Sequence, residues 1–278
     1  MQPSFVFAFL SAGSLLTGLA YAQQDRSFPK VTIPGSVVRS LKSASTGRQM
    51  ELYIHTPADY DRERTKKYPT LYFVDGQWDF KLMDSVLGGL VYDKFAPETI
   101  LVGITYAGEN PDYDALRAMD LTPPAPEPSR TFGNAPNFLK FLKTELIPFI
   151  ETNYRSDAAR RALQGASYGG LFTLYALFSD PGLFSGYIVT SPAVTYGNRF
   201  SFRQEADFAK EHKELQVKLY IGVGGAESFT APVKEFIDAV RSRGYKGLKL
   251  ETRVAEEERH SGSKPELFNR GLRFLFAD

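Results

Sequence analysis

Short apolar runs alternate with amphipathic segments along most of this chain. The apolar runs are typical of buried strands, whereas the segments between them carry apolar residues at helical spacing. The expected strands are residues 49–57, 69–76, 99–108, 160–166, 184–192, 217–224 and 248–256. The expected helices are residues 78–95, 136–154, 168–178, 199–215, 231–244 and 264–278. This alternation predicts an α/β fold, a mostly parallel sheet with helices on both faces.

The charge balance and the absence of cysteine narrow the possible functions. Lys and Arg number 33 against 32 Asp and Glu, a net charge of +1, so we expect no nucleic-acid partner. The chain has no cysteine, which excludes disulfides and thiolate sites. Its three histidines are too few for a histidine-rich metal centre, so we predict no bound metal.

The first residues have the pattern of an export signal. Residues 5–22 form an apolar run that ends in Ala20-Tyr21-Ala22, a small-x-small pattern before a cleavage point. The alternative is a membrane anchor, but the run is short and is interrupted by serine and glycine. We therefore predict a signal peptide at 1–22 and one domain at 23–278. The protein would be exported, periplasmic or secreted, without stable membrane insertion after cleavage.

A single serine lies between glycines where an expected strand meets an expected helix. The segment Gly165-Ala166-Ser167-Tyr168-Gly169 fits Gly-x-Ser-x-Gly, the nucleophile elbow. Such a turn is so tight that side chains at both glycines would clash, and it exposes the serine hydroxyl at the carboxyl end of the sheet. A glycine-rich turn that only permits close packing is the alternative. The strand-to-helix context favours the elbow, with Ser167 as nucleophile.

A serine hydroxyl needs a base, and this turn predicts the chain order serine, acid, histidine. His260 follows the last expected strand and fits that order, whereas His55 precedes the serine and His212 lies on a charged helix face. Glu227 is the first carboxylate after the preceding strand and is the expected acid. It could instead be a glutamate favoured by a helix N-terminus. Residues 256–258 are read as solvated loop glutamates.

Two backbone amides are expected to form an oxyanion hole. One is the amide of Tyr168, which follows the nucleophile, and the other belongs to Gly76 or Gln77, after the strand at 69–76. Gly76 permits an unusual backbone angle at this point. An ordinary tight turn is the alternative for this segment.

A long proline-rich stretch, residues 106–136, is expected to be irregular and to serve as a lid or substrate-binding wall. Arg117 and Arg130 lie in it, together with Tyr113, and Trp78 follows the oxyanion segment. Cationic and aromatic groups would suit an aryl or catecholate ester, so we expect Trp78, Arg117 and Arg130 to bind substrate. Packing of the tryptophan and solvation of the arginines are the alternatives.

Five segments together resemble the esterase D-like family of α/β hydrolases, and within it the esterases that open enterobactin-type siderophores. They are YPTLYFVDGQWDF, RAMDLTPP, LQGASYGGLF, LYIGVGGAE and RHSGSKPELFNRGLRFLF. The resemblance implies an α/β-hydrolase fold with about eight strands, Ser167 as nucleophile, His260 as base and Glu227 as acid. It also implies that residues 75–77 supply the oxyanion loop. One departure is Ala166, where many members of the family carry histidine.

These residues predict hydrolysis of a carboxylic ester in two acyl-transfer steps, with no cofactor. The family is broad, so its siderophore, aryl and carbohydrate esters all remain candidate substrates. An acyltransferase with a sugar acceptor and a non-catalytic binding protein on the same scaffold are the alternatives. The partner is a small-molecule ester, and the sequence leaves the oligomeric state open.

Overall fold

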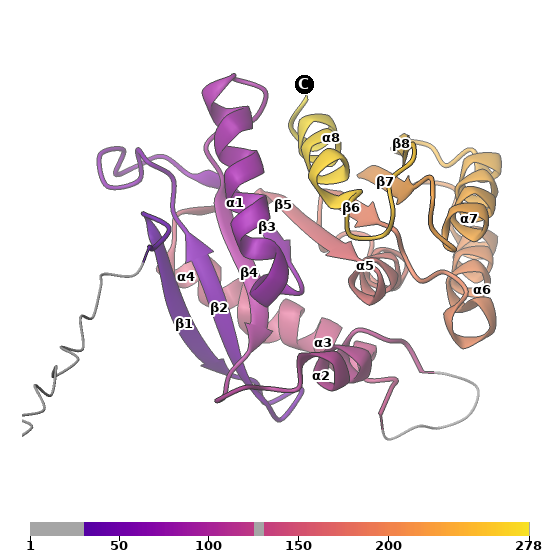
Figure 1. Ribbon diagram of the computed structural model, residues 1–278, viewed down its shortest axis with the longest axis horizontal. Helices are drawn as coiled ribbons and strands as arrows, with labels where there is room; N and C mark the ends of the chain where they lie inside the picture. The colour runs from indigo at the N-terminus through magenta and orange to yellow at the C-terminus, as the bar shows by residue number, and fades with distance from the viewer. Residues whose placement is uncertain (1–30, 125–130, 278) are drawn as a thin grey trace, which may run out of the picture. The chain divides into compact units, whose positions relative to one another are not determined.

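The centre of the fold is one eight-stranded sheet with the order β1-β2-β4-β3-β5-β6-β7-β8 (Figure 1). The computed structural model describes residues 31–124 and 131–277, and the fold lies within the compact unit Ile33–Asp278. The strands are β1 Ser36–Lys42, β2 Gln49–His55, β3 Tyr68–Phe73, β4 Ile100–Tyr106, β5 Ser156–Ala166, β6 Gly186–Thr190, β7 Lys218–Gly224 and β8 Lys249–Ala255. The mostly parallel sheet predicted from the sequence is confirmed.

Two strand pairs depart from the parallel arrangement. β1 pairs with β2 and β2 pairs with β4 in antiparallel register, while every later pair is parallel. The sequence did not predict β1, because most of its residues are exposed and its hydrophobic and polar residues do not alternate regularly. Val37 and Val38 are 43% and 59% exposed, as expected for an edge strand with little core to cover.

Helices cover both faces of the sheet. They are α1 Gly76–Tyr92, α2 Tyr113–Asp120, α3 Ala135–Phe141, α4 Ile147–Asn153, α5 Tyr168–Ser179, α6 Tyr196–Glu211, α7 Thr230–Arg243 and α8 Lys264–Phe276. α2 corrects the expectation of an irregular stretch at 106–136: Asp112 caps it by accepting the backbone N–H of Ala115 at 3.0 Å. The expected helix at 136–154 is divided into α3 and α4 by a π-helical turn, η1 Leu142–Leu146, just before Pro148.

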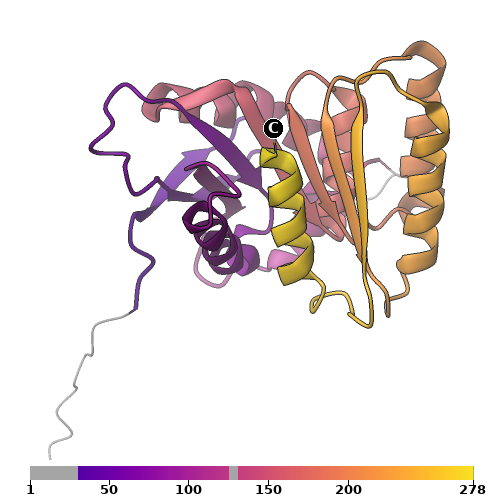
Figure 2. The same cartoon turned by 90° about the horizontal axis from the view of Figure 1, so that it is seen from above.

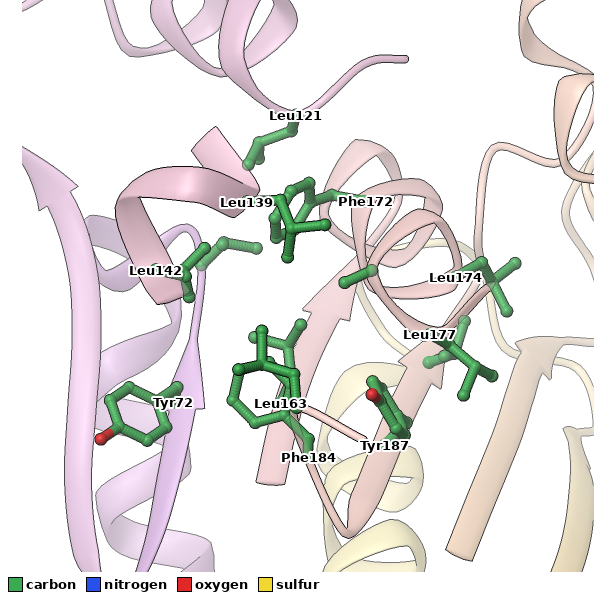
Figure 3. Packing of buried hydrophobic residues seen from close by; sticks show 14 of the residues in the cluster. Tyr72, Leu121, Leu139, Leu142, Leu163, Phe172, Leu174, Leu177, Phe184 and Tyr187 are labelled. Atoms are coloured by element: carbon green, nitrogen blue, oxygen red, sulfur yellow. The ribbon is translucent and has the colours of Figure 1, made fainter. Parts of the chain in front are cut away.

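Alternate residues of the strands point into two separate cores. Leu71 and Phe73 of β3 face α1 and α8, which pack side by side on one face of the sheet (Figures 1 and 2). Tyr72 and Val74 face the opposite way, into the larger core beneath α3, α4 and α5. Figure 3 shows this larger core, in which Leu163 of β5 lies among aromatic rings and leucines. Because the second half of β5, residues 162–166, is buried, the turn at its end has a rigid support.

The carboxyl ends of β3, β5, β6, β7 and β8 lie at the same edge of the sheet, since all these neighbours are parallel. Ligands of open α/β sheets bind at that edge, and the segments that follow these strands carry every predicted catalytic residue. The predicted signal peptide at 1–22 and Arg130 lie outside the described residues. Within the described part of the chain, no helix has the length and apolarity needed to cross a membrane.

Candidate active site

Ser167 occupies a strained turn between β5 and α5. Its backbone angles are φ 60° and ψ −117°, a conformation that L-residues rarely adopt. A Cβ atom on Gly165 would lie 2.2 Å from the carbonyl oxygen of Gly169, and one on Gly169 would lie 2.7 Å from Val74 Cγ2. Both glycines are therefore required for close approach, as the motif predicted. The turn leaves Ser167 partly exposed at the edge of the sheet.

The segment after β3 forms a second sharp turn beside the first. The unusual backbone angle lies at Asp75, with φ 61° and ψ 34°, and not at Gly76 as expected from the sequence. Gly76 is needed for a different reason: a Cβ there would lie 2.8 Å from the carbonyl carbon of Gly103. The backbone at the start of α1 therefore lies close to the backbone of β4.

Two helices begin at these turns. α1 starts at Gly76 and α5 starts at Tyr168, so the amides of Gly76, Gln77 and Tyr168 are first-turn N–H groups without an intrahelical acceptor. Free amides and the positive ends of two helix dipoles favour negative charge at this edge. The Gln77 side chain is turned away to accept the Thr105 hydroxyl at 2.8 Å, so only its backbone is available.

Glu227 accepts three hydrogen bonds in the loop after β7. Its Oε1 accepts the Gly224 N–H at 2.6 Å and the Ser191 hydroxyl at 2.5 Å, and its Oε2 lies 2.5 Å from Nδ1 of His260. The Glu227 side chain is 5% exposed. A buried carboxylate held by fixed donors has one orientation, and here the remaining oxygen faces the imidazole. The alternative of a helix-capping glutamate is not what the contacts show, since α7 begins only at Thr230.

The imidazole of His260 is held on one side only. Nδ1 faces Glu227, and the ring meets Phe229 edge-on with centroids 5.3 Å apart. Among residues 31–124 and 131–277, no hydrogen bond joins Nε2 of His260 to Oγ of Ser167. The two residues are connected through the neighbouring loop: the Ser167 N–H donates to Thr190 O at 3.1 Å, and Ser191 donates to Glu227.

Arg117 is not a free cation but is paired with a carboxylate, and its expected contact with substrate stays a prediction. Its Nε and one terminal nitrogen donate to the two oxygens of Asp75 at 2.8 and 2.7 Å. The side chains are 11% and 3% exposed, and the same guanidinium reaches Ala166 O at 3.4 Å. Burial lowers the pKa of Arg117, but the hydrogen bonds and charge of Asp75 outweigh it and raise the pKa. Arg117 therefore contacts both turns, through the Asp75 carboxylate and the Ala166 carbonyl.

Aromatic side chains surround the two turns. Trp78 is 44% exposed, meets Tyr113 edge-on at 6.1 Å, and lies 5.5 Å from the Arg117 guanidinium. On the other side Tyr168 meets Tyr196 edge-on at 6.0 Å. An exposed tryptophan ring next to these turns can contact a planar ligand.

The other titratable candidates lie elsewhere. Nδ1 of His55 contacts Asp84 of α1, and His212 ends α6 and stacks on Phe208 with centroids 4.1 Å apart. Glutamates 256–258 are exposed, as expected. In the described residues, histidine, aspartate and glutamate side chains form no cluster of three that could bind a metal ion.

Sequence reasoning missed Ser191 and the pairing of Asp75 with Arg117, although residue 75 was included in the expected oxyanion loop. Ser191 is 2% exposed, with φ 42°, and its role depends on the distant Glu227, so no local pattern marks it. Asp75 precedes the expected oxyanion glycine and could have been noticed as a carboxylate within that motif. Its partner Arg117 lies 42 positions away, beyond the reach of periodicity.

Comparisons with known proteins identify relatives of the whole domain. The model of the family described as "Putative esterase" matches residues 43–263. The ferri-bacillibactin esterase BesA of Bacillus subtilis is 26% identical over 263 residues, which are 87% of this chain and 90% of that protein. The siderophore triacetylfusarinine C esterase of Aspergillus fumigatus is 30% identical over 194 residues, 68% of this chain and 66% of that protein.

A solved structure shares the fold. The siderophore hydrolase EstB from Aspergillus nidulans superposes with a TM-score of 0.81 at 23% identity, covering 89% of this chain and 97% of that one. The family resemblance found in the sequence motifs is thereby confirmed. The chain belongs to the Putative esterase family, and it is an esterase with an α/β-hydrolase fold.

Proposed function

We propose that this esterase is a serine hydrolase in which Ser167, His260 and Glu227 form the catalytic triad. The observation that carries the proposal is the contact at 2.5 Å between Glu227 Oε2 and His260 Nδ1, beside a serine held in an elbow turn. A carboxylate at this nitrogen fixes the tautomer in which Nε2 is free to accept a proton. Glu227 also stabilises the imidazolium that forms when the proton arrives.

The reaction follows from these roles. Nε2 of His260 removes the proton of Ser167 as Oγ attacks the ester carbonyl, and the same proton then passes to the leaving alcohol. Water attacks the resulting acyl-enzyme with the same base, which releases the acid and restores the serine. In this mechanism the hydrogen bond between Ser167 and His260 forms when substrate binds. Hydrogen bonds between catalytic groups are often long in ligand-free enzymes and shorten in the complex with substrate.

The amides of Tyr168 and of Gln77 or Gly76 would bind the oxyanion. They belong to the first turns of α5 and α1, so both helix dipoles add to the stabilisation of negative charge. Loss of one such donor typically costs about 3 kcal/mol or more of transition-state stabilisation. Arg117 would keep the two turns at a fixed separation through Asp75 and the carbonyl of Ala166.

We further propose a siderophore ester, such as a catecholate trilactone, as the substrate, with other aryl or carbohydrate esters as the alternatives. The support is twofold: the relatives named above are siderophore esterases, and Trp78 offers an exposed ring beside the oxyanion turn. Arg130, outside the described residues, remains a proposed substrate-binding cation. The signal-like residues 1–22 support export to the periplasm or the medium as part of the same proposal.

Covalent labelling tests the mechanism first. A fluorophosphonate should label the wild-type protein at Ser167, and Ser167→Ala should abolish the label. Equal labelling of both proteins would contradict the proposal. Hydrolysis of ferric catecholate trilactones, aryl acetates, feruloyl sugars and acyl thioesters then defines the substrate. Faster acyl transfer to a sugar acceptor than to water would instead assign an acyltransferase.

A further inference from the structure

A second buried ion pair lies beside the Asp75–Arg117 pair, in the first turn of α1. Nζ of Lys264 lies 2.7 Å from Oδ1 of Asp79, and the two side chains are 20% and 4% exposed. Asp79 follows the oxyanion turn directly, and its N–H donates to Asp75 O at 3.1 Å. Lys264 is the first residue of α8 and follows His260 by four positions.

We propose that the Lys264–Asp79 ion pair is a positioning element that fixes the loop of His260 relative to the helix whose amides bind the oxyanion. The inference rests on the proposed function of Ser167, His260 and the α1 amides. Neither Lys264 nor Asp79 touches the reacting atoms. Their effect on catalysis would pass through the alignment of the base with the oxyanion hole.

The path from the ion pair to the imidazole is short and stiff. The Ser263 N–H donates to Arg259 O at 2.9 Å, and the Ser263 hydroxyl donates to His260 O at 3.1 Å, so the turn before α8 moves as one body. α8 and α1 pack against each other along the sheet (Figure 2). A shift of the first turn of α8 relative to α1 would therefore displace His260 relative to the amides of Gly76 and Gln77.

The dipole at the start of α1 favours the Asp79 carboxylate, but the pair also carries penalties that point to a role beyond helix packing. A lysine at the first residue of a helix opposes the helix dipole. Asp79 Oδ2 is buried without a hydrogen-bond partner among the described residues. Burial raises the pKa of Asp79 even though the charge and hydrogen bond of Lys264 lower it. A well-packed apolar pair would hold two helices together without these penalties.

Phosphonylation rates test the inference, because a small fluorophosphonate requires the base and the oxyanion amides but little substrate binding. We expect Lys264→Met and Asp79→Asn to slow labelling of Ser167, and kcat for an aryl acetate, by about tenfold to a hundredfold with KM unchanged, as a misplaced catalytic group does. Lys264→Arg keeps the charge and should restore most of the rate. The double variant should be no slower than the slower single variant, since both changes break the same pair.

Arg161→Met is the matched control. Arg161 pairs with Glu151 at 2.7 Å and is also 20% exposed, but it lies in the middle of β5, away from the carboxyl edge. It should label at the wild-type rate. Variants of Lys264 and Asp79 that melt earlier but label as fast as the wild type would show a merely structural pair and overturn the inference alone. If Lys264→Met does not fold, the near-isosteric Asp79→Asn decides. A wild-type protein that is not labelled at Ser167 would overturn the proposed function as well.

Discussion

Replacing Glu227 with glutamine tests the proposed triad most directly, because it changes one oxygen to an NH2 group and leaves the volume unchanged. Glu227 accepts from three donors: the Gly224 N–H, the Ser191 hydroxyl and the His260 ring. A glutamine has one carbonyl oxygen and cannot accept on both sides. If its NH2 faced Gly224, the N–H of that residue would lose its acceptor, which costs about 1 to 3 kcal/mol for a buried group.

The favoured orientation therefore keeps the carbonyl oxygen on Gly224 and Ser191 and turns the NH2 toward His260. That NH2 donates to Nδ1, so the ring proton moves to Nε2, the nitrogen that must accept the proton of Ser167. The equivalent change in a Ser-His-Asp triad lowers kcat by about 10⁴. A factor of this size corresponds to about 5.5 kcal/mol of lost transition-state stabilisation. Stability should change little, because the core is untouched.

Steady-state hydrolysis of an aryl acetate, with Tm measured alongside, gives the result. We expect kcat of Glu227→Gln to fall by about 10³ to 10⁴. Glu256→Gln is the control, since Glu256 is an exposed carboxylate at the end of the neighbouring strand, and it should keep wild-type turnover. If Glu227→Gln retains a tenth or more of the wild-type kcat, or if Glu256→Gln loses as much, the assignment of the acid is wrong.

Four other outcomes follow from the contacts. Gly165→Ala should destabilise the fold by about 1 to 3 kcal/mol through overpacking, in denaturant titrations, whereas Gly182→Ala, with nothing within 4 Å, should be tolerated. Ser191→Ala and Ser191→Gly both remove the donor to Glu227 and should slow turnover equally, but the glycine variant should be the more stable because φ is 42°. Trp78→Ala should raise KM for bulky aryl esters by about threefold to tenfold and leave KM for small acetates unchanged. Burial raises the pKa of Glu145, but hydrogen bonds from residues 44 and 45 outweigh burial and lower the pKa below its ordinary value of 4.5. The stabilisation by Glu145 is therefore present above about pH 4.5 and is lost as the pH falls through the folded-state pKa. The difference in unfolding free energy between wild type and Glu145→Gln should shrink on acidification, and a constant difference would contradict the reasoning.

The sequence predicted those parts of the fold that depend on local pattern. The strands at 69–76 and 99–108 are buried on both faces, so an unbroken apolar run identifies them. β1 was missed because it buries little, and α2 was missed because it is short and lies in a proline-rich segment. β1 pairs with the next strand, β2, whereas α2 is held in part by the contact of Arg117 with Asp75, 42 positions away, which periodicity does not register.

The candidate site likewise contains some residues that the sequence pattern indicated and others that it did not. Ser167, Glu227 and His260 could be proposed from the sequence because the elbow turn fixes an order along the chain, and parallel strands then bring their following segments to one edge. The pairing of Arg117 was not predicted because an arginine in an expected loop gives no sign of which carboxylate it will meet. Its contact with Asp75 exists only after α2 has packed beside the two turns.

Backbone strain at three turns on this edge of the sheet supports the proposed site. Asp75, Ser167 and Ser191 follow β3, β5 and β6, and their φ values are 61°, 60° and 42°. Each such residue costs about 1 to 3 kcal/mol, and glycine would remove most of that cost. Glycine would also remove the carboxylate that holds Arg117, the proposed nucleophile and the hydroxyl that orients Glu227. At these three positions the strain is kept because a side chain is needed that glycine would not supply. The burial of β3, of β6 and of residues 162–166 of β5 supplies the stability that offsets it.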